Sequence, residues 1–210
     1  MRALSAKQVL DLMERHKIEM VDIRIVDVPG RWQHFTLPAT EVDMGTFENG
    51  VPFDGSSVKG FRTIDQSDML MVLDPNTAVI DPFASVPTLS ILADAKLPSG
   101  QEYGRDPRTV ALRAERHLRE SGIADISYWG PELEFFLFDS VTHALSPHEA
   151  RYRFDSEESV WDPAETANHG YVIRPKDGYA QLPPHDATAD ARTEIVQMLR
   201  RQGVRVEMHH

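Results

Sequence analysis

The chain has no cysteine among its 210 residues, so disulfides and thiolate metal sites are excluded. Positive charge is also scarce, because 22 Lys and Arg residues stand against 33 Asp and Glu residues, which gives a net charge of −11 at pH 7. A surface of this sign argues against a general nucleic-acid-binding role. It is compatible with a metal site lined by carboxylates, and a solvated acidic surface explains it equally well. We therefore expect no nucleic-acid partner.

Long apolar runs are missing too, since no stretch of the sequence approaches the length of a membrane span. The first seven residues lead straight into an amphipathic pattern and lack the continuous apolar core of a signal peptide. We also find no phosphate-binding Gly-rich loop of the Walker or dinucleotide type, and no defensible Ser-His-Asp arrangement. The sequence predicts no membrane partner and, by default, a cytoplasmic protein.

The first hundred residues carry the pattern of a small, mostly β unit with one early helix. Ser5 and Gln8 form a plausible capping box for a helix that ends near His16. Pro29-Gly30 is a turn signal between two strands. The expected strands are residues 18–28, 32–37, 69–73, 78–80 and 89–92, and residues 47–62 are expected to form a loop.

The second half begins after a polar stretch, residues 94–106, that is expected to be a linker. Asp106 followed by Pro107 is typical of a helix start, and this helix is expected to end at Ser121. A second helix is expected from Asp186, as its cap, to Gln202. Strands are expected at residues 126–129, 130–138, 171–175 and 204–210, and residues 140–170 are expected to be irregular.

Two acidic residues stand in the predicted strand over residues 130–138. Side chains alternate between the two faces of a strand, so Glu132 and Glu134 would share one face. Both faces are otherwise apolar, which predicts burial on both sides and a high cost for two unpaired carboxylates. A strand end in solvent with two exposed acids would avoid that cost. The apolar flanks favour the alternative, a shared Mg²⁺ or Mn²⁺ ion.

Two further motifs are weak signals on their own. Phe53-Asp54-Gly55-Ser56-Ser57 has the composition of a tight turn, and it could equally present Asp54 as a base or a cation binder. Glu207 and His209 would share a face of the predicted last strand, where the adjacent histidines are either potential ligands or a surface or tag feature.

Taken in order, these pieces resemble the N-terminal part of a bacterial type I glutamine synthetase. The matching motifs span nearly the whole chain in the family's order and spacing. They are Asp27-Val28-Pro29-Gly30 with Gln33 to Pro38, Phe53 to Ser57 with Gly60-Phe61 and Ser67-Asp68-Met69, Tyr103 to Arg108, Gly130 to Phe136, Gly178-Tyr179 with Pro183-Pro184, and Val206 to His210.

The resemblance implies an α+β fold of two domains. Residues 1–100 would form a β-grasp-like N-terminal domain, and residues 101–210 would form the start of a catalytic domain built around a curved antiparallel sheet. Family members form homo-oligomers of two stacked hexameric rings, in which the N-terminal domain of one subunit closes the active site of the next. The family makes glutamine from L-glutamate, ammonium and ATP through γ-glutamyl phosphate, with divalent cations, Mg²⁺ or Mn²⁺.

The resemblance also implies roles for single residues. Asp54 would bind ammonium and take a proton from it, with Ser57 supporting its loop. Glu134 would hold the metal beside glutamate and the transferred phosphate, and Glu132 the metal beside the ATP phosphates. Glu207 would contact the nucleotide.

The family's remaining ligands lie beyond the residues of this chain, so the chain is expected to hold only part of one active site and to be inactive alone. Two alternatives remain open. One is a non-catalytic fragment that acts by co-assembly with complete subunits. The other is a paralogue that joins glutamate to a polyamine, although the intact Asp54-Gly55-Ser56-Ser57 loop favours ammonia.

Overall fold

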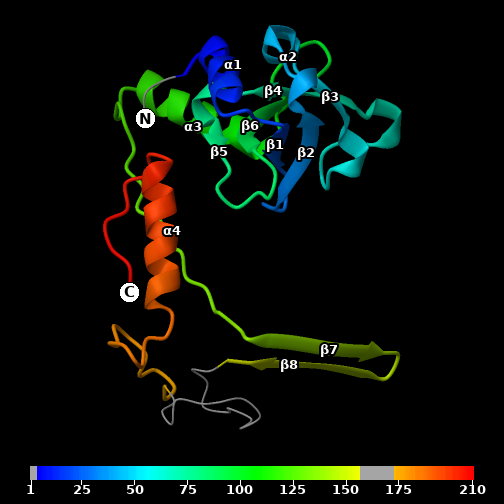
Figure 1. The fold of residues 1–210 in the computed structure, drawn as a ribbon. Coiled ribbons are helices and arrows are strands. Elements are labelled where there is room, and N and C mark those ends of the chain that lie inside the picture. The colour runs from blue at the N-terminus through cyan, green and yellow to red at the C-terminus, as the bar shows by residue number, and fades with distance from the viewer. Residues whose placement is uncertain (1–3, 157–172) are drawn as a thin grey trace. The chain divides into compact units, whose positions relative to one another are not determined.

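The computed structural model describes residues 4–156 and 173–210 (Figure 1). The chain divides into two compact units, Met1–Trp129 and Gly130–His210, and each is described by itself. Among the described residues, no helix has the length and apolar character needed to cross a membrane.

The first unit is built on one mixed sheet. Its strands are β1 (Met20–Val26), β2 (Trp32–Pro38), β3 (Val51–Asp54), β4 (Asp68–Leu73), β5 (Val79–Ile80) and β6 (Thr88–Lys96). The order is β2-β1-β6-β4-β3, with β5 paired to β6. β1 and β6 are parallel, and all other pairs are antiparallel.

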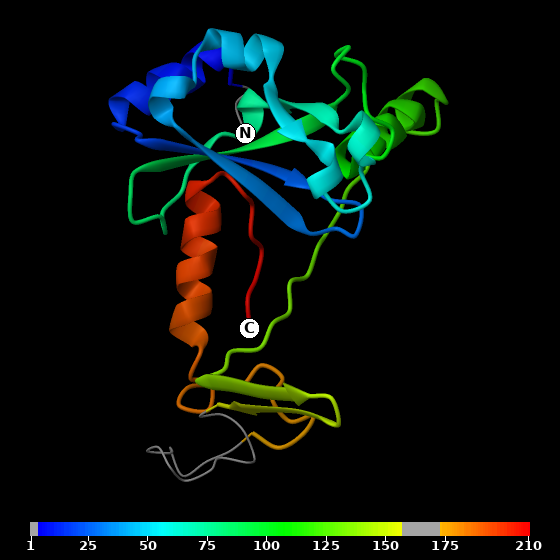
Figure 2. The same ribbon diagram turned by 90° about the vertical axis from the view of Figure 1, so that its right-hand side faces the viewer.

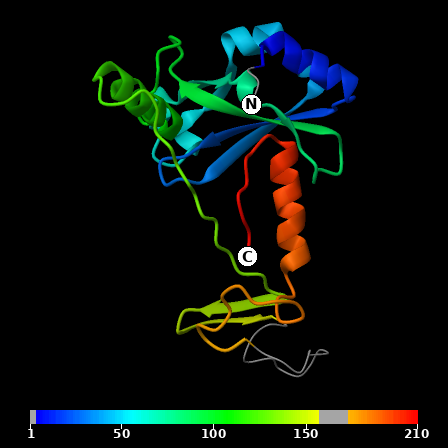
Figure 3. The same ribbon diagram turned by 90° about the vertical axis from the view of Figure 1, so that its left-hand side faces the viewer.

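Two helices cover one face of this sheet, α1 (Ala6–Arg15) and α2 (Met44–Asn49) (Figures 2 and 3). They bury Val9, Met13 and Phe47 against the apolar side chains of the central strands. Those strand residues include Val21, Ile23, Ile25, Met69, Met71, Leu89 and Ile91, each at most 1% exposed. A third helix, α3 (Pro107–Glu120), lies at one end of the sheet. The unit combines helices with a sheet, so the predicted α+β class is confirmed.

Local sequence signals located most of these elements. α1 has the predicted capping box, in which Ser5 and Gln8 exchange hydrogen bonds. α3 begins with Asp106 as its N-cap and Pro107 in its first turn. The loop expected over residues 47–62 is wrong in part, because the segment holds the end of α2 and all of β3. Asp43 caps α2 through Thr46, a signal that lies just outside the segment taken as loop.

The second unit contains one hairpin and one helix among its described residues. The strands β7 (Ser140–Ser146) and β8 (Glu149–Asp155) pair antiparallel, so the irregular structure expected there is wrong, while residues 157–170 lie outside the described part. Helix α4 (Ala189–Arg201) is present, and Gly203 follows it with a positive φ. Its N-cap position is Thr188, not the predicted Asp186, whose carboxylate forms an ion pair with Arg192 instead.

Four predicted strands are not found. Residues 126–129, 130–138 and 204–210 form no strand, nor do residues 173–175, while 171 and 172 lie outside the described part. The expected burial of the 130–138 segment is also wrong, because Leu133 is 81% and Phe136 85% exposed. A strand forms only where a neighbouring strand takes up its N–H and C=O groups. Among the described residues, no strand forms a β-ladder with these segments, so their alternating pattern does not give a strand.

An ion-pair cluster joins α3 to the sheet. Arg108 pairs with Asp74 and lies 3.4 Å from Asp94, and these three side chains are less than one quarter exposed. Burial raises the pKa of Asp94. Burial acts in the same direction on Asp74, but hydrogen bonds from Arg108 and Asn76 outweigh it and hold the pKa of Asp74 below its usual value.

Arg108→Met is expected to lower the free energy of unfolding of this chain by roughly 2–4 kcal/mol near pH 7, because two partly buried carboxylates lose their cation. Because the pKa of Asp74 is depressed, its stabilising contribution is present above the ordinary Asp pKa and is lost as pH falls through the folded value. The difference in unfolding free energy between Arg108→Met and the parent chain should therefore become smaller as the pH falls. Urea titrations followed by circular dichroism at several pH values measure it. Arg113→Met, which breaks a more exposed pair with Glu102, is the control and should cost less than about 1 kcal/mol. An equal cost for both variants would contradict this account.

Candidate functional site

The Asp54 loop, residues 54–62, begins where β3 ends and turns at once into a short 3₁₀ turn, Gly55–Ser57. One carboxylate oxygen of Asp54 accepts from the backbone N–H of Ser56 at 2.8 Å and from its hydroxyl at 2.6 Å. The other oxygen accepts from the hydroxyl of Ser57 at 3.2 Å. These bonds, those from Ser56 first, lower the pKa of Asp54 below its usual value. The loop therefore presents an exposed carboxylate that stays ionised at neutral pH.

The loop packs closely against its supports. Gly55 donates to the carbonyl of Ser67 at 2.7 Å, and a Cβ on Gly55 would lie 2.5 Å from the sulfur of Met69. No larger residue fits this position without displacing that side chain. Phe53, just before the loop, and Phe61, near its end, pack edge to face with ring centroids 6.4 Å apart. The position of Asp54 is therefore determined by tight packing on its chain neighbours.

Ser56 is the site residue that sequence reasoning missed. The resemblance assigned the supporting role to Ser57, and Ser57 does contact Asp54, but Ser56 makes two shorter bonds to the same carboxylate. An Asp side chain commonly accepts from the backbone two residues ahead in a turn, so the Asp-Gly-Ser spacing carried this signal.

Glu132 and Glu134 lie in the second unit on an exposed segment without regular structure. The shared strand face predicted for them is therefore not formed. Their carboxylates have the right chemistry for Mg²⁺ or Mn²⁺. Yet among the residues with described positions, no group of three or more His, Cys, Asp or Glu side chains could hold a metal ion. The described residues by themselves do not complete a metal site.

Glu207 also lies on an exposed segment of the second unit, and the strand expected there is absent. Its carboxylate lies 3.5 Å from the guanidinium of Arg205. A ring nitrogen of His209 lies 3.3 Å from the hydroxyl of Thr193 on α4, and the ring of His210 packs edge to face on Tyr179 at 4.8 Å. The structure thus brings Asp54 and Ser57 into contact, and it does not gather the three glutamates into a cluster.

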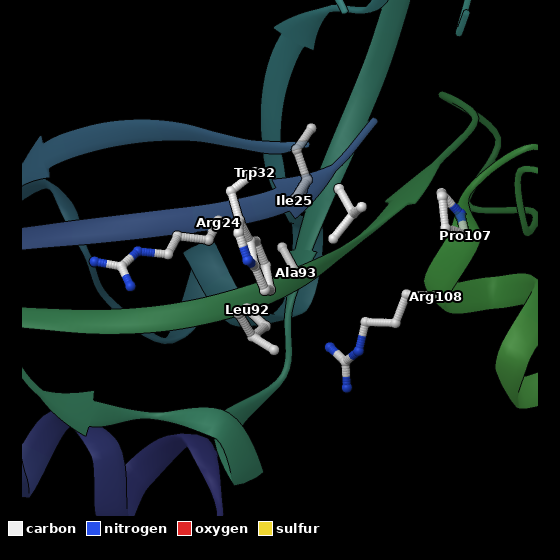
Figure 4. Close-up of a pocket in the computed structure, with 8 residues that line it drawn as sticks. Arg24, Ile25, Trp32, Leu92, Ala93, Pro107 and Arg108 are labelled. Carbon is white, nitrogen blue, oxygen red and sulfur yellow. The ribbon is translucent and has the colours of Figure 1, made fainter. Parts of the chain in front are cut away.

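A groove of about 300 Å³ lies elsewhere in the first unit, between β1, β2, β6 and the start of α3 (Figure 4). Its lining residues are Arg24, Ile25, Val26, Trp32, Leu92, Ala93, Pro107 and Arg108. Both arginines form ion pairs with aspartates. Arg24 pairs with Asp22 and Asp81, and Arg108 pairs with Asp74 and Asp94. The groove is mainly apolar and does not include the Asp54 loop, so we assign no substrate to it.

The mixed sheet of the first unit, with α1 and α2 on one face, defines the class of this part of the chain: a small α+β domain of the β-grasp kind. Residues 17–98 match the family model described as the glutamine synthetase beta-Grasp domain. Residues 104–210 match the model of the glutamine synthetase catalytic domain. The chain belongs to the glutamine synthetase family, of which it represents the N-terminal portion.

Individual relatives agree with this assignment. The chain is 44% identical over 210 residues to a glutamine synthetase of Nostoc, a match that covers 97% of this chain and 44% of the relative. It is 45% identical over 205 residues to a glutamine synthetase of Aquifex aeolicus, with the same coverage. A solved glutamine synthetase of Plasmodium falciparum shares the fold, with a TM-score of 0.84 at 21% identity, over all of this chain and 43% of that one. The chain spans less than half the length of these relatives.

Proposed function

We propose that this chain is part of an ATP-dependent ligase that joins ammonia to L-glutamate and makes L-glutamine. The observation that carries the proposal is the pair of family models matched in order along the chain. The exposed, ionised Asp54 carboxylate supports it, because a cationic substrate needs a carboxylate of this kind.

The proposed reaction has two steps. The γ-carboxylate of glutamate takes the terminal phosphoryl group of ATP, which yields γ-glutamyl phosphate and ADP. Ammonium then loses a proton to the Asp54 carboxylate and ammonia attacks the γ-carbonyl carbon. The C–N bond forms, the C–O bond to phosphate breaks, and a second nitrogen proton leaves with the phosphate. Phosphoryl transfer of this kind depends on alignment and charge neutralisation more than on covalent help from the protein.

Asp54 acts in the second part. Its side chain is held by Ser56 and Ser57, so it meets ammonium as an oriented anion rather than as a freely rotating one. A carboxylate with a lowered pKa binds a cation well and accepts a proton poorly. We therefore assign ammonium binding as the first role of Asp54 and proton acceptance as the second.

Glu132 and Glu134 are proposed as ligands of two divalent cations, Mg²⁺ or Mn²⁺, near the ATP phosphates and near glutamate respectively. Glu207 is proposed as a contact of the nucleotide. Each cation needs about six oxygen ligands from protein, substrate and water together, so these carboxylates would supply a minority of them.

The proposal extends to organisation and assembly. We propose a β-grasp domain over residues 1–100 and catalytic-domain sequence over 101–210, which the limits of the two family models support. The compact unit of the structure runs further, to Trp129, because it includes α3. We also propose a cytoplasmic homo-oligomer of two stacked hexameric rings.

A full-length enzyme that contains this chain is expected to release phosphate and glutamine in equal amounts from ATP, glutamate and ammonium. The assay couples phosphate release to glutamine detection, with a polyamine in place of ammonium as the comparison. The 210-residue chain alone is the control, and we expect no turnover from it. Product from a polyamine but not from ammonium would refute the proposed substrate, and turnover by the control would require a different active site.

A further inference from the structure

Tyr103 is a buried residue of the segment between β6 and α3, and it contacts the Asp54 loop. It is 8% exposed, and its hydroxyl donates a hydrogen bond to the carbonyl of Phe61. Its ring packs on the ring of Phe61 with centroids 5.3 Å apart. The guanidinium carbon of Arg62 lies 5.6 Å from the centroid of the same ring.

The side chain of Tyr103 contacts Phe61 and Arg62, and these two residues close the Asp54 loop. The backbone N–H of Arg62 donates to the carbonyl of Gly55 at 3.3 Å, and that of Phe61 donates to Val58 at 3.1 Å. Gly55 is the chain neighbour of Asp54. Tyr103 is therefore joined to the Asp54 backbone through one loop-closing hydrogen bond.

Neighbouring parts of the loop are held as well. The carbonyl of Lys59 accepts from the backbone N–H of Val28 at 3.3 Å, and the carbonyl of Gly60 accepts from Arg105 at 3.5 Å. With Phe61, three consecutive carbonyls of the loop are bound from three places on the first unit. The bond from Tyr103 is made in the interior, where losing it leaves a carbonyl without water to replace the donor.

We propose that Tyr103 is a positioning residue for the ammonium site: it holds the turn at Phe61 and Arg62, and through Gly55 it keeps the Asp54 carboxylate in place. This inference rests on the function proposed above for Asp54. Tyr103 itself touches no substrate in this account.

Tyr103→Phe removes the hydroxyl alone and keeps the ring that packs on Phe61. In a full-length enzyme that contains this chain, we expect the KM for ammonium to rise roughly fivefold, the scale of one lost hydrogen bond. The rate of γ-glutamyl phosphate formation without ammonium should stay within about twofold of the parent, since that step does not use Asp54. Steady-state assays and single-turnover phosphate transfer separate the two effects.

Thr109→Val is the matched control. Its hydroxyl is also buried at the start of α3, but it donates to Asp106 at 2.7 Å rather than to the loop. The control should lose stability as Tyr103→Phe does while the KM for ammonium remains unchanged. If Tyr103→Phe and Thr109→Val lose stability to the same extent and have the same KM for ammonium, Tyr103 serves only the stability of the fold and the inference fails.

Hydrogen exchange on this chain tests the contact between Tyr103 and the Asp54 loop without an activity assay. The amide of Arg62 should exchange faster in Tyr103→Phe than in the parent and in Thr109→Val. Arg62→Met, which removes the guanidinium from the Tyr103 ring, should also raise the KM for ammonium and tests the inference if Tyr103→Phe does not fold. Should Asp54→Asn leave the KM for ammonium unchanged, the ammonium assignment fails. The positioning role fails separately if Asp54→Asn raises this KM and Tyr103→Phe changes neither KM nor exchange.

Discussion

Asp54→Asn is expected to lower ammonia-dependent glutamine synthesis by roughly 10²-fold or more, because the proposed ammonium site loses its anion and its proton acceptor together. The substitution keeps the shape of the side chain and removes its charge and basicity. Formation of γ-glutamyl phosphate should suffer much less, because the proposed mechanism does not use Asp54 in that step. Rapid-quench measurement of the two steps in a full-length enzyme that contains this chain separates them.

Asp43→Asn is the matched control, because Asp43 is also an exposed aspartate whose pKa is lowered, in its case by Thr46. It caps α2 through Thr46, and Asn serves as a cap as well. Turnover of this variant should match the parent. Equal losses of both steps in Asp54→Asn would show that Asp54 supports the fold and does not serve ammonium.

The lowered pKa of Asp54 predicts how the ammonium dependence of the reaction varies with pH. An acid whose folded pKa lies below its usual value keeps its charge at every pH above that value, so Asp54 should remain ionised from about pH 5 to 8. A change of ammonium dependence within that range would come from another group.

Glu134→Ala is expected to abolish turnover in a full-length enzyme that contains this chain, and to weaken the protection that Mn²⁺ gives against heat. A cation that binds only the folded state stabilises it, so the loss of a ligand reduces the rise in Tm at a given Mn²⁺ concentration. Thermal melts across a Mn²⁺ titration, run beside the activity assay, measure both effects.

Glu149→Ala serves as the control, because Glu149 is an exposed acid at the start of β8 and has no proposed role in metal binding. Its Mn²⁺ titration should match that of the parent. Titrations that remain unchanged in both Glu132→Ala and Glu134→Ala would exclude these carboxylates as metal ligands. The result matters because the described part of the chain does not gather three candidate ligands in one place.

The successes of the sequence-based predictions share a cause. The starts of α1 and α3 depend on hydrogen bonds within three residues, Ser5 with Gln8 and Asp106 with Thr109. Such bonds form from the local sequence whatever the rest of the chain does. The strands of the first unit other than β3 were also predicted, from the alternation of residues 18–28 and from short runs of strand-forming residues elsewhere.

The errors share a cause as well. Residues 130–138 carry a pattern that predicts a buried strand, yet they form no strand and expose Phe136. Asp is a common N-cap residue, yet the carboxylate of Asp186 forms an ion pair with Arg192. In each case the outcome depends on a partner outside the local pattern, and composition and spacing do not report whether that partner is present.

What the sequence by itself determined is local: the starts of α1 and α3, most strands of the first unit, and a turn at Asp54-Gly55-Ser56-Ser57. The motifs also sufficed to indicate the glutamine synthetase family. Only the tertiary structure decided that β1 and β6 lie side by side in parallel and that Tyr103, within a stretch that resembles a polar linker, reaches a carbonyl 42 residues away. Caps and turns are governed by contacts within a few residues, whereas strand pairing and buried long-range bonds require distant segments to close on one another, and that closure depends on the packing of the whole unit.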